Sequence, residues 1–471
     1  MLMVFIGLYL VLTLLVGWWA SRHVKNTSDF VVAGRNMPML VAASALFATW
    51  FGSETILGAS SEFLEHGLLG VIEDPFGAAM CLVLVGVFYA RPLYRLNLLT
   101  FNDFYRLRFG RRAEFISALF IVPSYFGWIA AQLVALAIIL KALMGVPLFY
   151  GIAICAFVVV VYTYIGGMWA VSVTDSIQTV MILAGLLYLA FILLRAVGGI
   201  EQVLASTPEG FFRFTPRWNW LSGLEYLAAW ITIGLGSIPQ QDVFQRVMSA
   251  RNERTAVEAS VVSGLMYLTI GLIPLLIGLC GKLLYPDSLD GDTQLVIPMM
   301  VMREGNLWLQ TLFFGALLSA ILSTTSGAIL APATVIGENL IKPRLPGLSD
   351  QRLLRIMRLA VVGVALCAAL LAGVKADIYE LVAQSSSLSL VSLFVPLTAG
   401  LFWPGASRTG GLASMLVGMG CWLVLELFIH PEVPTLLWGL GASLLAMVIG
   451  SRLWPDASYT DFLEATASPG P

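Results

Sequence analysis

The chain has 471 residues, of which 59% are hydrophobic and only 11% are charged, and its formal net charge is −2. An ordinary soluble domain carries about 25% charged residues, so this composition excludes a soluble globular protein, and the nearly balanced charge gives no indication of a nucleic-acid partner. Apolar runs of about 20 residues recur along the whole length, and each is long enough to cross a bilayer. The sequence therefore predicts an all-α polytopic membrane protein rather than a β-barrel, which would show short alternating segments.

Apolar runs separated by Gly, Pro and charged residues predict thirteen transmembrane helices. The first is expected to be a retained span with its N-terminus outside, because its positive charges follow the apolar run, whereas in a signal peptide they precede it. The predicted spans cover residues 2–20, 38–60, 68–90, 114–141, 148–166, 175–196, 223–243, 258–283, 308–337, 356–374, 380–402, 411–430 and 434–452.

Lysine and arginine lie mainly on one side of these spans. With the N-terminus outside, 19 of the 26 Lys and Arg residues fall on the inner side, which is the bias expected of a cytoplasmic face. We therefore expect an integral plasma-membrane protein, in a bacterial inner membrane, with its C-terminus in a short cytoplasmic tail (453–471). No catalytic triad or phosphate loop is recognisable, so an enzyme is not expected.

The cysteines show no disulfide or metal pattern. All five lie within apolar segments, without pairing or ligand spacing, and we expect them to be buried, inert thiols. The three histidines form no cluster that could hold a metal. The cysteines are Cys81, Cys155, Cys280, Cys367 and Cys421.

The second span contains a weak, polar stretch, "ATWFGSETILGAS" (48–60), which predicts a helix break near Trp50–Ser53. Irregular backbone at membrane depth is tolerated where it lines a cavity or binds an ion. A lone acid at this depth, here Glu54, is a functional candidate by default. Glu54 could bind a cationic group, carry a coupled proton or satisfy amides exposed at the break, and the residues alone leave these roles open.

The seventh span contains a second interruption, "GLGSIPQQDVFQR" (234–246). Pro239 lacks an amide hydrogen and clashes with a preceding carbonyl, so it interrupts the helix. Two interrupted helices five spans apart are what an inverted five-plus-five repeat produces, although two ordinary kinks would look the same. Asp242 lies one helical turn before Arg246, a spacing typical of a structural pair.

The ninth span is rich in hydroxyl groups: "GALLSAILSTTSGAIL" (315–330). Ala320, Ser323 and Thr324 share one helix face, and their carbonyl and hydroxyl oxygens are hard ligands of the kind that an alkali cation requires. The alternative is that each hydroxyl bonds back to its own helix. Asp175 is a further intramembrane acid, and it either serves function or caps the sixth span with Gln178 as its capping-box partner.

Five segments, in order, resemble the sodium/solute symporter family over nearly the full length. They are "SDFVVAGRNM" (28–37), "ALFATWFGSETILG" (45–58), "YTYIGGMWAVSVTDSIQTV" (162–180), "IPQQDVFQRVMSA" (238–250) and "LLSAILSTTSGAIL" (317–330). The resemblance implies a leucine-transporter-type inverted repeat with an extra leading helix. The single transport domain, 1–471, would comprise a leading helix (1–21), a first repeat (38–196), a second repeat (223–402) and two additional helices (403–452).

The resemblance also implies a sodium site. The family's principal site maps onto the backbone carbonyls of Ala48, Phe51 and Ala320 and the hydroxyls of Ser323 and Thr324. Some members hold a second sodium, for which the matching positions here include Asp175, Ser323 and Ser326. Gly327 stands where the two-sodium members have a hydroxyl, and this argues against a second ion.

Within the family, the motifs look most like the high-affinity choline transporter branch. Trp50 and Trp128 match positions of an aromatic cage, which would hold a quaternary ammonium by cation–π attraction. Gln240 stands where that branch has a tryptophan, and Glu54 stands where it has a glycine. The cage is therefore incomplete, and choline is one candidate beside amino acids such as proline and small organic acids.

These observations predict a sodium-coupled symporter that imports a small polar organic solute by alternating access, working as a monomer. The expected solute site comprises Trp50, Ser53, Glu54, Trp128 and Gln240. Two alternatives stay open: a proton-coupled transporter that uses Glu54, and a membrane solute sensor. The lack of a C-terminal signalling module argues against the sensor.

Overall fold

The computed structural model describes residues 27–456 except 218, 287–291 and 346, and beyond that range only residues 4, 5, 7, 8, 11, 12, 15, 18, 19, 22, 458–460 and 462. Side chains are not described at 27, 165–167 and 169–171. Most of the predicted leading span, 2–20, lies outside the described residues, as does most of the predicted tail 453–471.

All the regular secondary-structure elements of the described chain are helices. The only β pairing in that part of the chain is a single bridge between Met37 and Ala250. The α-helices are α2 (Thr27–Val32), α3 (Met39–Ala48), α4 (Ser60–His66), α5 (Ala78–Leu84), α6 (Ala90–Arg95), α7 (Phe101–Phe109), α8 (Arg111–Met144), α9 (Leu148–Val197), α10 (Ile200–Ala205), α11 (Trp220–Gly236), α12 (Gln241–Met248), α13 (Glu253–Ile270), α14 (Leu272–Leu284), α15 (Val296–Glu304), α16 (Leu307–Val335), α17 (Asp350–Val374), α18 (Ile378–Ser389), α19 (Val395–Phe402), α20 (Arg408–Val424) and α21 (Thr435–Leu453). Shorter 3₁₀ and π segments join them: η1 (Ala33–Arg35), η2 (Glu54–Ala59), η3 (Gly67–Val71), η4 (Ile72–Gly77), η5 (Val85–Tyr89), η7 (Thr293–Leu295), η8 (Ile336–Ile341), η9 (Lys342–Arg344), η10 (Leu390–Phe394) and η11 (Leu425–Ile429).

The helices confirm the predicted all-α polytopic architecture. Within the described residues, nine helices are long and apolar enough to cross a bilayer, or ten if the bent pair α11–α12 forms one span. Two helical runs each carry parts of two predicted spans: residues 54–95 continue the second and include the third, and α9 holds the fifth and sixth. The count of thirteen spans stays a prediction.

Both predicted helix breaks are present. In the second span, α3 ends at Ala48, residues 49–52 form a turn, and the helix resumes at Ser53. In the seventh, α11 ends at Gly236, and α12 begins at Gln241 at an angle of 47° to it. The glycines and Pro239 in these stretches weaken the helical ladder at these points.

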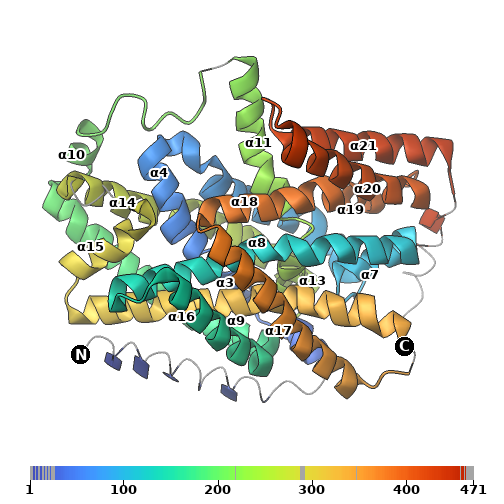
Figure 1. The fold of residues 1–471 in the computed structure, drawn as a ribbon, viewed down its shortest axis with the longest axis horizontal. Coiled ribbons are helices and arrows are strands. Elements are labelled where there is room, and N and C mark those ends of the chain that lie inside the picture. Colours follow the sequence, from blue (N-terminus) through green and yellow to red (C-terminus); the bar gives the residue numbers. More distant parts are fainter. Residues whose placement is uncertain are drawn as a thin grey trace.

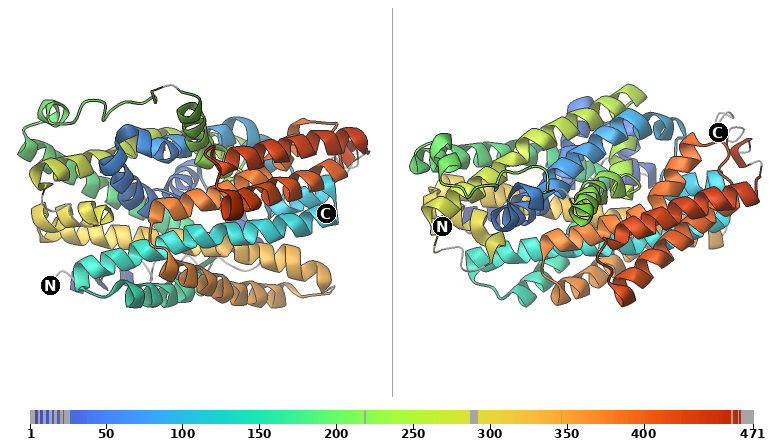
Figure 2. Two further views of the ribbon diagram at one scale, coloured as in Figure 1. Left: turned by 45° about the horizontal axis from the view of Figure 1, so that its top comes forward. Right: turned by 90° about the horizontal axis from the view of Figure 1, so that it is seen from above.

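The hydroxyl-rich helix α16 is deeply buried, and in Figure 1 it runs through the lower part of the view and passes behind α17. In the run 307–344 that begins with α16, 94% of the most apolar window is buried within the protein, and α16 packs mainly against α8 and α9. The corresponding windows of α17, α20 and α21 are only 28–33% buried. In both views of Figure 2, α20 and α21 lie side by side along one edge, as expected for helices that face lipid.

The burial of the cysteines differs from the prediction at two positions. Cys81, Cys155 and Cys280 are buried, but Cys367 is exposed and Cys421 is half-buried. Both lie on peripheral helices, α17 and α20. In a membrane protein an apolar side chain also faces lipid, so an apolar neighbourhood in the sequence does not imply burial against protein.

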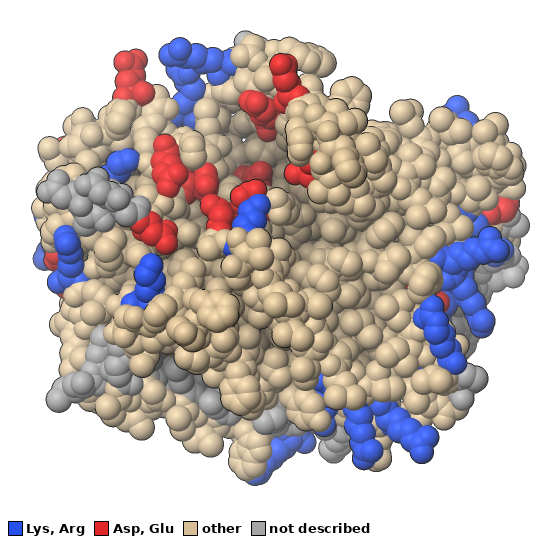
Figure 3. Space-filling view, viewed as in Figure 1, with Lys and Arg blue, Asp and Glu red and all other residues tan. Residues whose placement is uncertain are grey.

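Charged side chains are unevenly distributed along the helix bundle. In Figure 3, Lys and Arg side chains dominate the right-hand end, where α8 begins and α21 ends in the view of Figure 1. Asp and Glu side chains gather on the opposite half of the face, over the region of α4 and α11. The two ends of the bundle therefore present different electrostatic surfaces.

Candidate functional site

The two predicted sodium-binding segments meet at the break in the second span. The hydroxyl of Thr324 in α16 donates a hydrogen bond of 3.0 Å to the carbonyl oxygen of Ala48, the last residue of α3. Gly52, inside the turn, also faces α16, since a Cβ at this position would be in ordinary van der Waals contact with the side chain of Ile321, at 3.8 Å. The break in the second span is therefore packed directly against the hydroxyl face of α16.

The expected sodium ligands are all buried. Ala48, Phe51, Ala320, Ser323 and Thr324 are each no more than 5% exposed. They lie on both sides of one contact, since Ala48 ends α3 and Phe51 lies in the turn that follows, while the other three lie on α16. Their carbonyl and hydroxyl oxygens are chemically suited to a sodium ion, which transporters hold with unwound backbone carbonyls.

Hydroxyl groups from α9 extend this cluster. Thr174 and Ser323 lie 3.2 Å apart through their side-chain oxygens, and the hydroxyl of Tyr162 lies 3.3 Å from that of Thr174. Thr325, in contrast, bonds back to the carbonyl of Ile321 in its own helix. The alternative interpretation, in which each hydroxyl is satisfied by its own helix, thus holds for Thr325, whereas Thr324 bonds to another helix.

Asp175 does not cap a helix. It lies inside α9, which runs without a break from Leu148 to Val197, and Gln178 donates to the hydroxyl of Ser319 at 2.6 Å instead of serving as a capping-box partner. The capping interpretation is wrong, because the fifth and sixth predicted spans belong to one helical run. Asp175 is fully buried, and the guanidinium of Arg246 lies 3.8 Å from its carboxylate.

Four of the five expected solute-site residues line one narrow space. This space is too narrow to hold even a water molecule, so a solute could enter only after its walls separate. The fifth residue, Ser53, is not among the lining residues, and its hydroxyl donates to Gln132 at 2.6 Å. The lining residues are Trp50, Glu54, Trp128, Ser237, Gln240, Val382, Ser385 and Ser386.

Helix α18 supplies lining residues that the sequence analysis missed. Ser386 lies 3.1 Å from the hydroxyl of Ser237, and Ser385 donates to the backbone carbonyl of Ser124. The signal was present as the run "QSSSLS" (384–389) inside an otherwise apolar span. Because serines in membrane helices mostly bond back to their own helix, that run carried no specific prediction.

Glu54 is enclosed by aromatic and acidic side chains. Its carboxylate is 1% exposed, and its Oε2 accepts no hydrogen bond from any described residue. The indole N–H of Trp128 faces it but likewise completes no hydrogen bond within the described chain. The ring of Trp50 lies edge-on to that of Tyr267, at 6.5 Å between centroids. The carboxylate of Asp74 is a close electrostatic neighbour.

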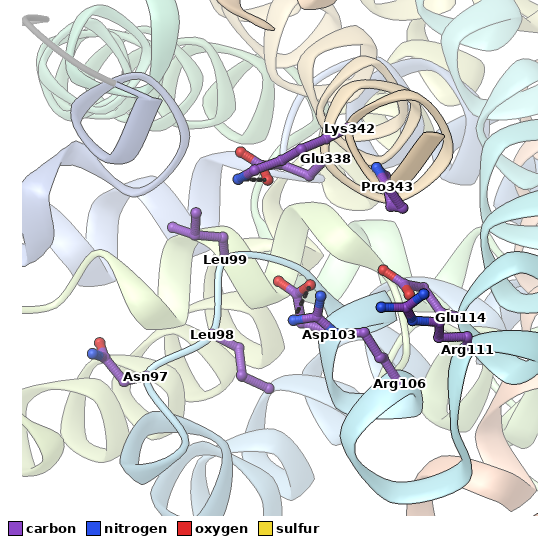
Figure 4. Close-up of a pocket in the computed structure, with 10 residues that line it drawn as sticks. All are labelled: Asn97, Leu98, Leu99, Asp103, Arg106, Arg111, Glu114, Glu338, Lys342 and Pro343. Atoms are coloured by element: carbon purple, nitrogen blue, oxygen red, sulfur yellow. Dashed lines mark hydrogen bonds and ion pairs between the residues drawn. The ribbon is translucent and has the colours of Figure 1, made fainter. Parts of the chain in front are cut away.

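A second polar cluster lies where α16 continues into η8. Asn339 donates to Asp103 at 3.2 Å and to Glu114 at 2.9 Å, and it accepts a hydrogen bond of 2.9 Å from Thr100. Beside it lies a cavity of about 360 Å³, in which Figure 4 shows Asp103, Arg106, Arg111 and Glu114 facing the Glu338–Lys342 pair. This cluster joins the 100–114 segment to the end of the ninth span.

Known proteins resemble this chain in both sequence and fold. A family model, the sodium:solute symporter family, matches residues 30–418. The high-affinity choline transporter 1 of Caenorhabditis elegans is 27% identical over 446 residues, which cover 87% of this chain and 75% of the transporter. The high-affinity proline transporter of Bacillus subtilis is 26% identical over 477 residues, which cover 95% of this chain and 98% of that transporter.

Solved structures agree with these relatives. A Na⁺-coupled sialic acid symporter in a substrate-bound outward-open state aligns with a TM-score of 0.81 over 97% of this chain and 98% of the symporter, at 20% identity. A nucleobase-cation-symport-1 family transporter in a closed conformation aligns with a TM-score of 0.63 over 93% of this chain and 99% of the transporter, at 17% identity. At these identities the structures show a shared fold. The family match covers most of the chain, and the chain therefore belongs to the sodium:solute symporter family.

Proposed function

We propose that this protein couples sodium entry to the import of a small organic cation that carries N–H groups. One observation carries the proposal: a buried carboxylate, Glu54, faces a narrow space between Trp50 and Trp128 and has an oxygen without a partner among the described residues. An isolated charge at membrane depth is costly and needs a partner. A cationic solute would supply that partner.

The chemistry of the site favours an amine over a quaternary ammonium. Aromatic faces attract either kind of cation, but a quaternary ammonium has no N–H to donate. The open oxygen of Glu54 and the hydroxyl of Ser386 are acceptors that a protonated amine would satisfy. The ammonium group of choline, the solute in the names of the choline transporter relatives, has no N–H to donate to Glu54, and only the hydroxyl of choline could donate to the carboxylate.

Acidic residues continue from Glu54 toward the surface. Glu54 lies within electrostatic range of Asp74 and Glu73, Glu73 within range of Glu62, and Glu62 within range of Asp377, which is exposed. A series of like charges in a low-dielectric cleft concentrates ions of the opposite sign. The arrangement supports attraction of a cation toward the Glu54 site.

Sodium would be held by the carbonyls of Ala48, Phe51 and Ala320 and the hydroxyls of Ser323 and Thr324. The contact between Thr324 and Ala48 supports this assignment, because a cation there would join the broken second span to α16. The bend of α11 against α12 supports the proposed two repeats, 38–196 and 223–402, as does the break after α3.

We place the Arg-rich end, with the Asn339 cluster, on the cytoplasmic side, with the N-terminus outside. We also propose that the protein works as a monomer. A plasma membrane, as in bacteria, is the proposed location.

The test is a thermal-shift screen of the purified protein against amines, quaternary ammoniums, amino acids and organic acids, with and without sodium. We expect a primary or secondary amine to raise the melting temperature only with sodium, since a ligand stabilises the state that it binds. Glu54→Gln should abolish that shift. Glu65→Gln, which changes an exposed carboxylate in α4, should retain it. A shift caused only by acids or neutral solutes would refute a cationic substrate.

Proton coupling is a second candidate, which the burial of Glu54 favours. If Glu54 carried the driving proton, a pH gradient would drive uptake by proteoliposomes in sodium-free buffer, and Glu54→Gln would abolish that uptake. Uptake that follows only the sodium gradient would exclude this candidate.

A further inference from the structure

A groove on the outer surface of the bundle lies between α8, η8 and α17 and contains none of the residues of the proposed solute and sodium sites. Its volume is about 510 Å³, which lies within the range of about 300–1,000 Å³ that is typical of ligand pockets. All of its lining residues are apolar, among them Val122, Phe126, Ile341, Leu359 and Gly363. The groove therefore has the size and the chemistry to hold a hydrocarbon chain.

The described residues leave this groove open to the surroundings. Leu359, on the α17 wall, is exposed, and a Cβ built on Gly363 would meet no atom within 4 Å. The α8 wall continues toward the beginning of that helix as Leu119 and Phe115, which are exposed as well and share a face with the lining residues of α8. In a chain that spans a membrane, apolar side chains on the outer surface meet lipid tails. An acyl chain is therefore the molecule next to this groove.

The apolar stripe of α17 ends in arginines. Ile356, Leu359 and Gly363 follow one another at intervals of three or four residues and so share one face of the helix. Arg352 stands one turn before Ile356, and Arg355 stands one turn before Leu359. Both arginines are exposed, and neither forms an ion pair with another described residue. Two unbalanced positive charges thus stand on the α17 side of one end of the groove.

A third arginine stands on the α8 side of the same end. The guanidinium carbon of Arg344, in η9, lies 4.8 Å from the centroid of the Phe115 ring, within the range of a cation–π contact. The segment 342–358, which includes all three arginines, carries five basic residues and one acidic residue. Figure 3 shows Lys and Arg side chains at the lower edge of the view, near the beginning of α17 in Figure 1. Positive charge therefore gathers at one mouth of an apolar groove.

We propose that the groove binds an anionic phospholipid, with one acyl chain between α8 and α17 and the phosphate among Arg344, Arg352 and Arg355. Basic pockets between transmembrane helices on the cytoplasmic side bind acidic lipid headgroups. The cytoplasmic leaflet follows from the proposed orientation, in which the Arg-rich end is cytoplasmic. The lipid site depends neither on the identity of the solute nor on the coupling ion.

The charge of the mouth selects among phospholipids. Guanidinium groups bind phosphate oxygens with paired, charge-assisted hydrogen bonds. A zwitterionic headgroup carries a cation of its own, which the arginines repel, whereas the headgroup of phosphatidylglycerol adds no positive charge. The apolar walls accept any acyl chain, so the arginines supply the preference for an anionic lipid. Because the bound chain would contact both α8 and α17, the lipid should also stabilise the packing of these helices.

The test titrates the delipidated protein in detergent with dioleoyl-phosphatidylglycerol or dioleoyl-phosphatidylcholine and counts bound lipids by native mass spectrometry. We expect each chain to retain one phosphatidylglycerol about 10-fold more tightly than phosphatidylcholine, and its melting temperature to rise with phosphatidylglycerol. Glycerol 3-phosphate, which offers the phosphate without the chains, should do neither. Equal retention of the two lipids would overturn the proposal, and so would a site that takes glycerol 3-phosphate as well as the lipid.

Removing two of the arginines should weaken the preference for phosphatidylglycerol. For Arg352→Gln with Arg355→Gln we expect a loss of affinity of about 30-fold, which corresponds to about 1 kcal/mol for each arginine. The control, Arg251→Gln with Arg254→Gln, removes the same charge from exposed positions at the beginning of α13 and should keep the affinity. Equal losses in the two double variants would indicate a general effect of surface charge and contradict a site in the groove.

Blocking the groove should remove the lipid without changing any charge. Gly363→Phe places a ring where a Cβ meets no atom within 4 Å, so we expect a folded protein that no longer retains phosphatidylglycerol. Gly373→Phe is the matched control, because position 373 is equally open but lies in the last turn of α17, outside the groove. Full retention of phosphatidylglycerol by Gly363→Phe, or equal loss in both variants, would place the lipid elsewhere and overturn the proposal.

Discussion

The hydroxyl of Thr324 in α16 donates a 3.0 Å hydrogen bond to the carbonyl oxygen of Ala48, which ends the first half of the broken second span. The two residues are far apart in the sequence and belong to the two halves of the proposed inverted repeat. The carbonyl of Ala48 is available to α16 because the helix stops there. The contact therefore joins the two proposed repeats at the place where sodium would bind.

Removing the hydroxyls of this contact should abolish sodium coupling. We expect the double variant Ser323→Ala with Thr324→Ala to lose sodium-stimulated uptake and to bind sodium about 10- to 150-fold more weakly, since hydrogen bonds and ligands to a charged group contribute about 1.5–3 kcal/mol. Calorimetric sodium titration measures the change. The matched control is Thr325→Ala, one position along, whose hydroxyl bonds within its own helix. Unchanged sodium dependence in the double variant would rule out the assigned site.

The aromatic walls of the proposed solute site should contribute affinity for the solute but not affinity for sodium. We expect Trp128→Leu to raise the solute KM about 2- to 30-fold, because a cation–π contact contributes about 0.5–2 kcal/mol, while Trp128→Phe recovers part of the loss. Trp308, which is 80% exposed, provides the control: Trp308→Leu should leave KM unchanged. Equal KM values for Trp128→Leu and the wild type would place the solute elsewhere.

The Asn339 cluster should stabilise the end of the bundle that carries most of the arginines. Asn339→Ala removes the donor to the carboxylates of Asp103 and Glu114, and we expect it to lower the free energy of unfolding by about 1–3 kcal/mol. Thermal melting in detergent measures the loss. Lys342→Ala breaks only the partly exposed pair with Glu338 and should cost less than about 1 kcal/mol. A larger effect at Lys342 than at Asn339 would contradict this ranking.

The close approach of α11 to α18 should depend on Gly236. A Cβ at this position would overlap the backbone oxygen of Ser386, so Gly236→Ala must push the two helices apart at the solute site. We expect a loss of about 1–3 kcal/mol in stability and a marked loss of solute binding. A methyl group at Gly363 in α17 would meet nothing within 4 Å, so Gly363→Ala should be neutral or slightly stabilising. Melting curves and thermal-shift titrations of both variants provide the comparison.

Local chemistry along the sequence was enough to predict the fold class and the places where helices break. Apolar runs of bilayer length leave few alternatives to helices, because every backbone polar group in lipid must be paired internally. Glycines at 52 and 58 and Pro239 weaken helices wherever they stand, so both breaks were predictable. The family followed from five motifs in order, and the match over residues 30–418 confirms it.

Which polar groups meet, in contrast, depends on how the helices pack. Local spacing placed Arg246 beside Asp242 and left a helix cap as one of two interpretations of Asp175, whereas in the structure Arg246 reaches Asp175 on another helix. Likewise, Ser385 and Ser386 of α18 line the same narrow space as Glu54, and Ser53 donates a hydrogen bond to Gln132. A sequence records which groups one helix carries, but the pairing of buried charges depends on how helices cross. That crossing is set by the packing of whole helix faces, as at Gly327, where the absence of a side chain leaves room for the guanidinium of Arg246.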